Sequence, residues 1–147
     1  MRTAPAYIRT YFADEIVEMK GKSENRGLIA EDIAVDFLRL RGYVILERNY
    51  RYRKAEIDII ARDDDTIVFV EVKLRKADPR GATPLEAVDA KKQKLMTKGA
   101  IYYASKQYGH GINLRFDVVG LTLDDYRGTM QISHIVNAFR ADERYYF

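Results

Sequence analysis

The clearest pattern along the chain is a pair of short apolar runs, 57–61 and 67–72, which are rich in β-branched residues. The acidic residues 63–65 lie between them, and two such runs joined by a short polar segment predict a β-hairpin. The second run continues to residue 74 with apolar side chains on both faces: Val68, Val70, Val72 and Leu74 on one, Ile67 and Phe69 on the other. This pattern is typical of a strand buried on both sides.

A four-residue loop would fix the register of this hairpin. It gives three cross-strand pairs: Arg62 with Ile67, Asp58 with Glu71, and Glu56 with Lys73. Facing side chains have Cβ atoms about 4.5–5.5 Å apart, and like charges there destabilise a sheet, so Asp58 and Glu71 predict a bound cation. The alternative is a solvated strand face. The expected burial argues against it, because charges beside a core need partners. Lys73 shares a face with Glu71, since side chains alternate along a strand.

Residues 25–41 change to a helical period, with apolar residues on one side and Gly42 as a C-terminal stop. Glu31 departs from this pattern, because at about 100° per residue it points to the apolar side. Either its carboxylate has a role beside the core, or it offsets the helix dipole. The second role needs no burial and contributes only about 0.3–1 kcal/mol.

A strand over residues 43–50 leads into a turn that carries cations and aromatic rings: Arg51, Tyr52, Arg53 and Lys54. Arg and Lys contact phosphates, and tyrosine rings stack on bases or sugars. The turn lies directly before Glu56 and Asp58. This position favours a nucleic-acid contact beside the carboxylates, with a solvated turn as the alternative.

The segment 75–82 is basic and contains Pro and Gly, which predicts a loop able to cover a site. Arg75 and Arg80 are its candidates for phosphate contact. A helix is predicted to follow, because its start carries a capping box: Thr83, Pro84 and Glu86. Lys92 lies within the apolar stripe of this helix, where a snorkelling stem is the alternative to a functional amine.

Two further strands are predicted over residues 114–121 and 131–139. Arg115 and Asp117 share a face of the first strand. Two histidines lie in this region, His110 in a loop and His134 in the last strand. Neither has metal-ligand spacing to nearby residues, so we assign both a structural role.

Residues 1–24 are predicted to be an N-terminal extension of a single domain spanning residues 25–147. Apolar positions favour a short helix: Tyr7, Ile8, Tyr11, Phe12, Ile16, Val17 and Met19. Such a helix would serve as a docking or dimer arm. A disordered leader is the alternative, and the sequence does not separate the two.

The composition permits a nucleic-acid partner and excludes several kinds of chemistry. The 147 residues, 47% of them hydrophobic, suit one domain with a substantial core. A net charge of +3 and a pI near 9.0 permit a polyanionic partner. The absence of cysteine excludes disulfides and thiolate chemistry and favours a cytoplasmic location. No apolar run approaches the ~20 residues of a membrane span, and the first residues lack a signal-peptide core.

Glu31, Asp58, Glu71 and Lys73 are the polar residues that interrupt the apolar pattern, and together they suit phosphodiester hydrolysis. Carboxylate oxygens are ligands of Mg²⁺ or Mn²⁺, and Mg²⁺ typically takes one or two carboxylates beside water and substrate phosphate. Such a metal activates water and neutralises phosphodiester charge, and a lysine stabilises the transition state. No Ser-His-Asp arrangement, cysteine nucleophile or phosphate-binding Gly loop competes with this interpretation.

Longer strings surround the D-x(n)-E-x-K spacing of Asp58, Glu71 and Lys73. They are G-x-x-A-E at residues 27–31, GYVILERNYRYRKAEIDIIARDDDTIVFVEVKLR, EAVDAKKQKL and RFDVV. Across residues 27–119 the chain resembles the YraN-like family of uncharacterised bacterial proteins. That family is regarded as having a restriction-endonuclease-like, PD-(D/E)XK fold similar to archaeal Holliday-junction resolvases. Its members usually have Gly where this chain has Ala55.

The resemblance implies an α/β fold with a restriction-endonuclease-like core, in which helix, three strands, helix and strand build a mixed central sheet flanked by helices. It implies these active-site positions: Glu31, Asp58, Glu71 and Lys73. Lys92 and Asp117 are secondary candidates on the same resemblance. Glu56 is retained as a secondary candidate, although its expected pairing with Lys73 argues against a role as a metal ligand.

The expected function is therefore a Mg²⁺- or Mn²⁺-dependent endonuclease acting on DNA, with branched or structured DNA as the substrate class. Asp58 and Glu71 would hold the metal, Glu31 would assist through water, and Lys73 would act on the nucleophile. The alternative is a non-catalytic nucleic-acid-binding or assembly protein that retains the fold and contacts phosphate through its cations: Arg51, Arg53, Lys54, Arg75, Arg80 and Lys92. Resolvase-like enzymes act as homodimers, but the sequence leaves the oligomeric state open.

Overall fold

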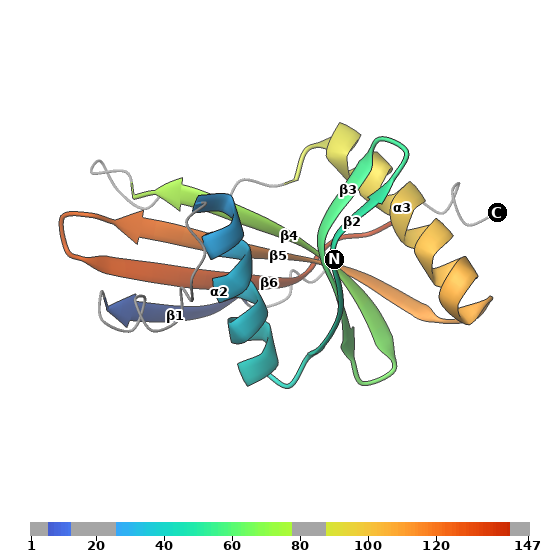
Figure 1. Ribbon diagram of the computed structural model, residues 1–147, viewed down its shortest axis with the longest axis horizontal. Helices are drawn as coiled ribbons and strands as arrows, with labels where there is room; N and C mark the ends of the chain where they lie inside the picture. The colour runs from blue at the N-terminus through green and yellow to red at the C-terminus, as the bar shows by residue number, and fades with distance from the viewer. Residues whose placement is uncertain (1–5, 13–25, 78–87, 142–147) are drawn as a thin grey trace.

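The computed structural model describes residues 6–12, 26–77 and 88–141. Over these residues the chain forms a six-stranded sheet with two helices packed on it (Figure 1). The elements in chain order are β1 (Ala6–Phe12), α2 (Arg26–Leu40), β2 (Val44–Tyr52), β3 (Ala55–Asp63), β4 (Thr66–Lys76), α3 (Ala90–Tyr108), β5 (Asn113–Asp124) and β6 (Thr129–Phe139). Among the described residues no helix is long and apolar enough to cross a membrane.

The sheet is mixed, with strand order β1-β6-β5-β4-β3-β2. Among the described strands β4 and β5 are parallel and all other neighbours are antiparallel. A parallel pair needs a long crossover connection, and the segment between β4 and β5 contains α3. The mixed α/β fold and the order helix, three strands, helix, strand are confirmed from α2 to β5.

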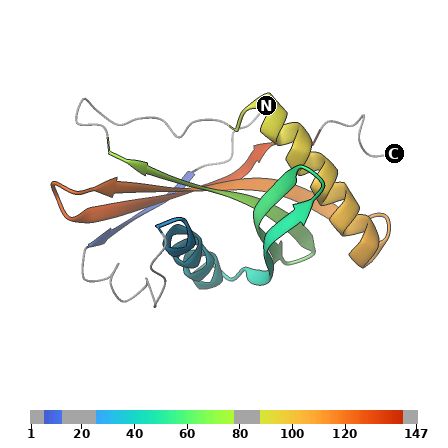
Figure 2. The same cartoon turned by 45° about the horizontal axis from the view of Figure 1, so that its top comes forward.

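The two helices cover opposite faces of the sheet (Figure 2). On one face Phe37 and Leu38 of α2 pack with Val68 and Val70 of β4. On the other face the buried side chains of α3, Met96 among them, form a second cluster with alternate residues of β4: Ile67 and Phe69. The prediction that β4 is buried on both faces is therefore confirmed, except at Leu74, which is 37% exposed.

The predicted hairpin register is confirmed where β3 and β4 pair. Arg62 lies opposite Ile67, and the ladder runs from Asp63–Thr66 to Ile59–Val70. The loop itself is shorter than the predicted four residues, because Asp63 and Thr66 also pair and leave only two residues between them. Asp64 takes a positive φ of 51° in this loop, a conformation that Asp tolerates better than most residues.

Beyond Ile59 and Val70 the two strands separate, and Figure 1 shows β4 and the β2–β3 hairpin diverging. β4 stays paired with β5 up to Lys76, whereas β3 stays paired with β2. The predicted pairings of Asp58 with Glu71 and of Glu56 with Lys73 are therefore wrong, because both lie beyond the last β3–β4 pair. Glu56 pairs with Arg51 instead. Contacts between α3 and β3 account for the divergence, because they hold the hairpin against the helix.

The described part of the N-terminal extension is a strand and not the predicted helix. Residues Ala6–Phe12 form β1, which pairs antiparallel with β6 and extends the sheet. Tyr11 is buried in the core on the α2 face. Tyrosine, isoleucine and phenylalanine are favourable in strands, and pairing with the edge of β6 overrides the helical spacing of the apolar residues. The rest of the extension, residues 1–5 and 13–25, lies outside the described residues.

Two boundaries around the predicted basic loop differ from expectation. β4 continues through Arg75 to Lys76, since these residues pair with β5. The predicted capping box at Thr83 and the loop residue Arg80 lie outside the described residues. The described helix α3 begins at Ala90, with Asp89 as its N-cap accepting a hydrogen bond from the Lys92 backbone N–H at 2.8 Å.

Candidate functional site

The point where β3 and β4 separate is spanned by a side chain. Asp58 Oδ2 accepts a hydrogen bond of 2.8 Å from the backbone N–H of Val72. The carboxylate thus satisfies a β4 donor just past the last cross-strand pair, Ile59 with Val70. We call the place where β3 and β4 separate, just past Ile59 and Val70, the fork. A buried backbone N–H needs a hydrogen-bond partner, so this bond joins the two strands at the fork and fixes the orientation of Asp58.

Glu71 lies beside Asp58 in this fork and is poorly compensated. Its side chain is 16% exposed, and Lys92 Nζ lies 3.5 Å from its Oε2 atom. Among the described residues Oε2 is buried and has no hydrogen-bond partner. Burial raises the pKa of Glu71 to about 7, and the Asp58 carboxylate adds to this effect, while Lys92 and Lys73 oppose it. Near neutral pH Lys92 and Lys73 therefore compensate the negative charge of Glu71 only in part.

The pKa of Asp58 is raised as well, and its causes identify its neighbours. Burial is the main cause, and the hydrogen bond from the Val72 N–H opposes it. Glu31 raises the pKa further, Lys92 lowers it, and the exposed Glu56 raises it as the last of these causes. The structure therefore brings Glu31 of α2, Asp58 of β3, Glu71 of β4 and Lys92 of α3 into one electrostatic group.

Glu31 occupies the position predicted for it on the apolar side of α2. Its side chain is 14% exposed, and its Oε2 atom, 3.7 Å from Arg48, has no hydrogen-bond partner among the described residues. Arg48 of β2 also donates a 2.6 Å hydrogen bond to Asp32. The sequence analysis did not identify Arg48. The available signal was the adjacent acidic pair Glu31 and Asp32 on α2. Their ion pairs with Arg48 depend on how α2 packs across β2.

The two lysines approach Glu71 from different elements. Lys92 Nζ donates a hydrogen bond of 3.1 Å to the backbone oxygen of Glu56, which ties the first turn of α3 to β3. The Lys92 side chain is 30% exposed, and its amine lies 3.5 Å from Glu71 Oε2. Lys73 is partly buried two residues beyond Glu71 on the same strand.

The donor atoms suit a small divalent cation with few protein ligands. Among the described residues no group of three or more His, Cys, Asp or Glu side chains is arranged to hold a metal ion. The fork instead offers two neighbouring carboxylates, Asp58 and Glu71, of which one has an unpartnered buried oxygen. Mg²⁺ commonly binds through one or two carboxylates and keeps several waters, so this pair fits Mg²⁺ or Mn²⁺ chemistry.

Asp117 does not join this group, contrary to the expectation from the resemblance. It neighbours Val70 in the β4–β5 ladder and is completely buried. Its carboxylate is occupied by hydrogen bonds from other residues: His134 Nε2 at 2.8 Å, Arg115 Nε at 2.9 Å and the Asn137 N–H at 3.0 Å. Burial alone would raise the pKa of Asp117, but the hydrogen bonds from His134 and Arg115 outweigh it and lower the pKa.

His134 is part of the same buried network, in agreement with its predicted structural role. Its Nδ1 atom lies within hydrogen-bond distance of the Arg41 guanidinium. Arginine only donates, so Nδ1 accepts and Nε2 carries the proton that His134 donates to Asp117. Arg115 extends the network, since it also donates to Asp63 at 2.8 Å and to the Tyr43 hydroxyl at 2.6 Å.

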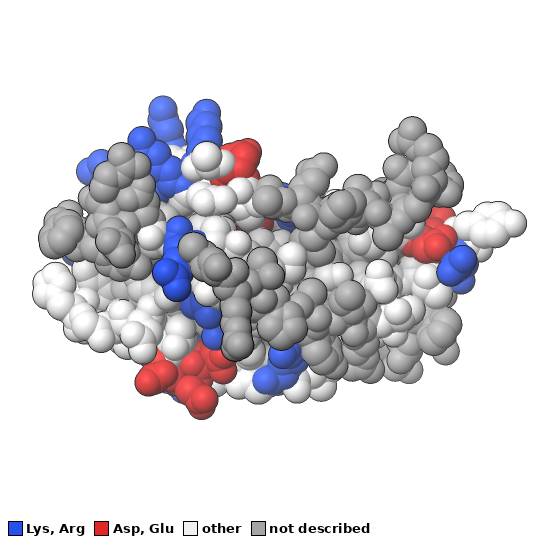
Figure 3. All heavy atoms as spheres, turned by 180° about the vertical axis from the view of Figure 1, so that it is seen from behind, with Lys and Arg blue, Asp and Glu red and all other residues white. Residues whose placement is uncertain are grey.

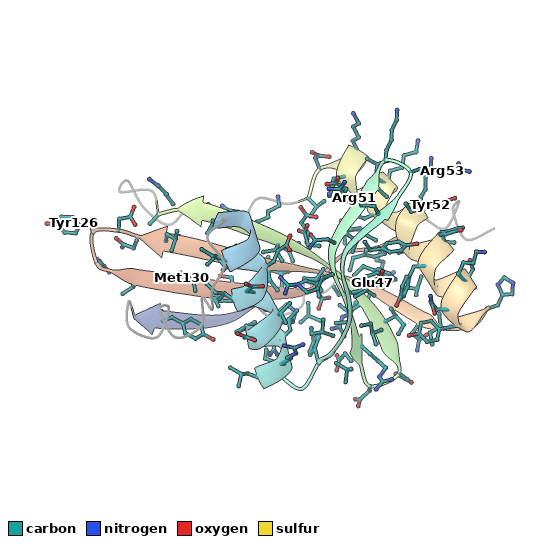
Figure 4. The ribbon with its side chains drawn as sticks, in the orientation of Figure 1. Glu47, Arg51, Tyr52, Arg53, Tyr126 and Met130 are labelled. Carbon is teal, nitrogen blue, oxygen red and sulfur yellow. The ribbon has the colours of Figure 1, made fainter. Side chains whose placement is uncertain are left out.

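The remaining candidates lie along the surface around the fork. Glu56 is 59% exposed at its side chain and forms an ion pair of 3.5 Å with Arg51, so it is not a member of the buried carboxylate group. Arg51, Tyr52 and Arg53 lie at the end of the β2–β3 hairpin (Figure 4). Lys and Arg side chains gather at this end of the molecule (Figure 3), whereas Arg75 lies farther along β4.

The model of the uncharacterised protein family UPF0102 matches residues 30–121. The chain belongs to this family. The UPF0102 protein of Prosthecochloris aestuarii is 44% identical over 120 residues, which are 79% of this chain and 94% of that protein. The UPF0102 protein of Desulforapulum autotrophicum is 42% identical over 124 residues, 84% of this chain and 100% of that protein. The expected membership in a family of uncharacterised proteins is thus confirmed.

The UPF0102 match includes every residue of the group at the fork, from Glu31 to Lys92. Among solved structures, that of Pyrococcus furiosus SfsA in complex with Ca²⁺ aligns with a TM-score of 0.36 and 17% identity, over 71% of this chain and 59% of that chain. A score this low supports no inference about fold family or function. The similarity to restriction endonucleases and resolvases therefore stays a prediction.

Proposed function

We propose that this UPF0102 protein is a metal-dependent endonuclease that hydrolyses phosphodiester bonds in DNA. The observation that carries the proposal is the carboxylate pair at the fork: burial raises the pKa of both Asp58 and Glu71, the Asp58 charge raises that of Glu71 further, and one Glu71 oxygen has no hydrogen-bond partner among the described residues. A purely structural pair of this kind would be unfavourable, since buried like charges repel. A divalent cation removes that cost.

The residues take distinct roles in this proposal. Asp58 and Glu71 would hold Mg²⁺ or Mn²⁺, which when bound supplies a Lewis acid for the phosphate and lowers the pKa of water. Glu31 would assist through a water molecule. Lys73 orients the nucleophile and stabilises charge on the phosphate. Lys92 is held between Glu71 and the Glu56 carbonyl, where it is available to phosphate once a metal neutralises Glu71.

Topology supports the same proposal at the level of the fold. From α2 to β5 the chain follows the order helix, three strands, helix, strand that the resemblance to restriction-endonuclease-like proteins implies. The three acidic residues lie on the first helix and on the second and third of those strands. We propose this superfamily as the fold family, with branched or structured DNA as substrate and a homodimer as the working unit.

Cleavage of branched, single-stranded and duplex DNA with Mg²⁺ or Mn²⁺ tests the proposal. Wild-type protein should cut at least one substrate, and Glu71→Gln, Asp58→Asn and Lys73→Ala should each reduce the rate at least about 100-fold, the scale of losing one transition-state stabilising group. Glu56→Gln is the matched control, since Glu56 is exposed and outside the carboxylate group. Cleavage that survives in Lys73→Ala, or that Glu56→Gln removes equally, would contradict these assignments.

A second candidate is a nucleic-acid-binding or assembly protein without catalysis. It is favoured by the ion pair of Lys92 with Glu71, which places a protein cation where a metal would act. Binding of DNA by the wild type in EDTA, with no cleavage of any substrate in Mg²⁺ or Mn²⁺, would establish this alternative. Sedimentation of the purified chain with and without DNA would test the proposed homodimer.

A further inference from the structure

One end of the molecule carries a surface that the reaction at the fork does not use. It comprises the end of the β2–β3 hairpin, residues 51–54, and a stripe on α3 made by Lys94, Lys98, Tyr102 and Lys106. We call it the basic platform. The four α3 residues are spaced four apart and therefore share one face of the helix, and all four are exposed.

The charge of α3 is unusual for a solvated helix. The helix contains five lysines and no acidic residue. Like charges four residues apart destabilise a helix, whereas alternating Glu and Lys would stabilise it. A helix that keeps only lysines is suited to a polyanion, because bound phosphates remove the repulsion.

Two tyrosines stack at the centre of the platform. The rings of Tyr52 and Tyr102 have centroids 3.9 Å apart and planes inclined by 13°. Arg53 lies over the Tyr52 ring at 5.3 Å, and Lys106 lies over the Tyr102 ring at 5.8 Å. Each ring of the stacked pair therefore has a cation close to it.

The turn that positions Arg53 is strained. Arg53 has a positive φ of 54°, which in a tight hairpin turn favours Gly or Asn. A long cationic side chain at this position gives up conformational freedom that glycine would retain. Such outliers persist where the surrounding structure or a function requires them, and here the outlier places a guanidinium beside the partly exposed tyrosine pair.

We infer that the basic platform binds an unpaired DNA strand, with a base stacked on the Tyr52–Tyr102 pair and neighbouring phosphates on the lysines of α3. Base stacking on an aromatic ring exceeds an exposed cation–π contact, so an incoming base displaces Lys106 or Arg53, whose charge then meets a phosphate. This inference rests on the proposed function and adds a substrate class to it, DNA with a single-stranded segment.

The platform is close enough to the fork for one strand to reach both. Ala55 and Asp58 are three residues apart on β3, a rise of about 10 Å. Lys92 and Tyr102 are ten residues apart on α3, about 15 Å along the helix. A binding site for a single strand covers about 4–16 nucleotides. One bound strand is therefore long enough to cover both separations. A base held on the tyrosines would therefore position a phosphate of the same strand at Asp58 and Glu71.

Equilibrium binding of a fluorescent oligo-dT and of a duplex of equal length, measured in EDTA with the full chain, tests the inference. Tyr102→Ala should weaken oligo-dT binding about tenfold, the effect of losing one base stack, and leave duplex binding within twofold. Tyr102→Phe should bind like the wild type, because it keeps the ring. Tyr126→Ala is the matched control: Tyr126 is fully exposed at the β5–β6 turn, at the opposite end of the molecule (Figure 4).

Tyr102→Leu gives a second test, since it removes the ring but keeps an apolar side chain should the alanine variant unfold. Unchanged oligo-dT binding in folded Tyr102→Leu, or an equal loss for oligo-dT and duplex, would overturn the inference. Either result alongside metal-dependent cleavage by the wild type would leave the proposed function standing. Wild-type protein that binds neither oligo-dT nor duplex and cleaves no DNA substrate would contradict both the inference and the proposed function.

Discussion

At the residue scale, Asp117 and Glu71 show how differently two buried carboxylates are treated in one sheet. Asp117 is fully buried and its oxygens are satisfied by donors from three residues. Glu71 is less buried, yet one of its oxygens has no hydrogen-bond partner among the described residues. A buried carboxylate whose oxygens all accept hydrogen bonds is typical of a structural residue. A buried carboxylate with an unpaired oxygen and a raised pKa is typical of a binding site.

The first prediction follows for Asp117. Replacing it by alanine leaves the Arg115 guanidinium and the His134 N–H without their main acceptor, and breaking a buried ion pair in this way costs about 3–5 kcal/mol. We expect Asp117→Ala to lower the free energy of unfolding by this amount in urea denaturation, and Asp117→Asn to cost less because it keeps one acceptor. A loss of cleavage without a loss of stability in Asp117→Asn would instead return Asp117 to the active site.

The second prediction concerns pH and Glu71. Its pKa is about 7 in the folded chain against 4.5 for an unperturbed glutamate, so the folded state binds more protons than the unfolded state between these values. The sign is therefore a fall in stability as pH rises from about 4.5 to 7. One pKa unit corresponds to about 1.4 kcal/mol, and partial solvent screening reduces the total, so we expect a decline of about 1–3 kcal/mol without metal.

Urea denaturation in EDTA at several pH values measures this decline. Glu71→Gln should be more stable than the wild type at pH 7 and should lack most of the decline. Glu56→Gln is the control, since Glu56 is exposed. Mg²⁺ at pH 7 should stabilise the wild type more than Glu71→Gln, because a ligand that binds only the folded state adds to its stability. A parallel pH profile of wild type and Glu71→Gln would contradict the assignment.

At the element scale, the packing of α3 on β3 decides where the fork lies. A Cβ on Gly99 would stand 3.1 Å from the Ala55 Cβ and 3.3 Å from Ile57 Cδ1. This contact explains how the chain accommodates the Ala55 side chain beneath α3. Gly99 supplies the space on the helix side, so only one of the two positions carries a methyl group.

The third prediction uses this contact. Gly99→Ala gains about 1 kcal/mol in helix propensity, but overpacking against the Ala55 and Ile57 side chains costs about 1–3 kcal/mol, so we expect a net loss of roughly 1 kcal/mol. In an Ala55→Gly background the same substitution should be neutral or stabilising. A thermodynamic cycle from urea denaturation measures the coupling, and an equal cost of Gly99→Ala in both backgrounds would show that the two residues do not compete for space.

The same elements show what could be predicted from sequence. The paired part of the β3–β4 hairpin follows from its β-branched runs and acidic turn, and Glu31 follows from the helical period of α2. Local patterns could not predict that the ladder ends at Ile59, because α3 draws β3 away from β4. They also missed that residues Ala6–Phe12 add to the β6 edge, since helical spacing and strand preference are both present there and a distant partner decides between them.

At the scale of the whole molecule, a net charge of only +3 conceals an uneven distribution. Lys and Arg gather at the end formed by the β2–β3 hairpin and α3 (Figure 3), while the opposite end has Lys76 in an ion pair of 3.9 Å with Asp125. Phosphate binding should therefore depend on one end of the molecule. The salt dependence of DNA binding tests this asymmetry without any measurement of cleavage.

Single-stranded DNA bound at the basic platform releases counterions in proportion to the phosphates that are neutralised, with a slope of log K against log salt of about −0.7 per contact. For four to six contacts we expect a slope of about −3 to −4.

Lys54→Ala, at the hairpin turn, should make the slope less steep by about 0.7 and weaken binding at low salt more than at high salt. Lys76→Ala is the matched control, because Lys76 lies at the far end of β4, and it should leave the slope unchanged. Fluorescence titrations between about 50 and 300 mM salt measure both variants. A flat salt response of the wild type would remove phosphate contact as the source of affinity, and an equal effect of the two lysines would place the DNA across the whole sheet and not at one end.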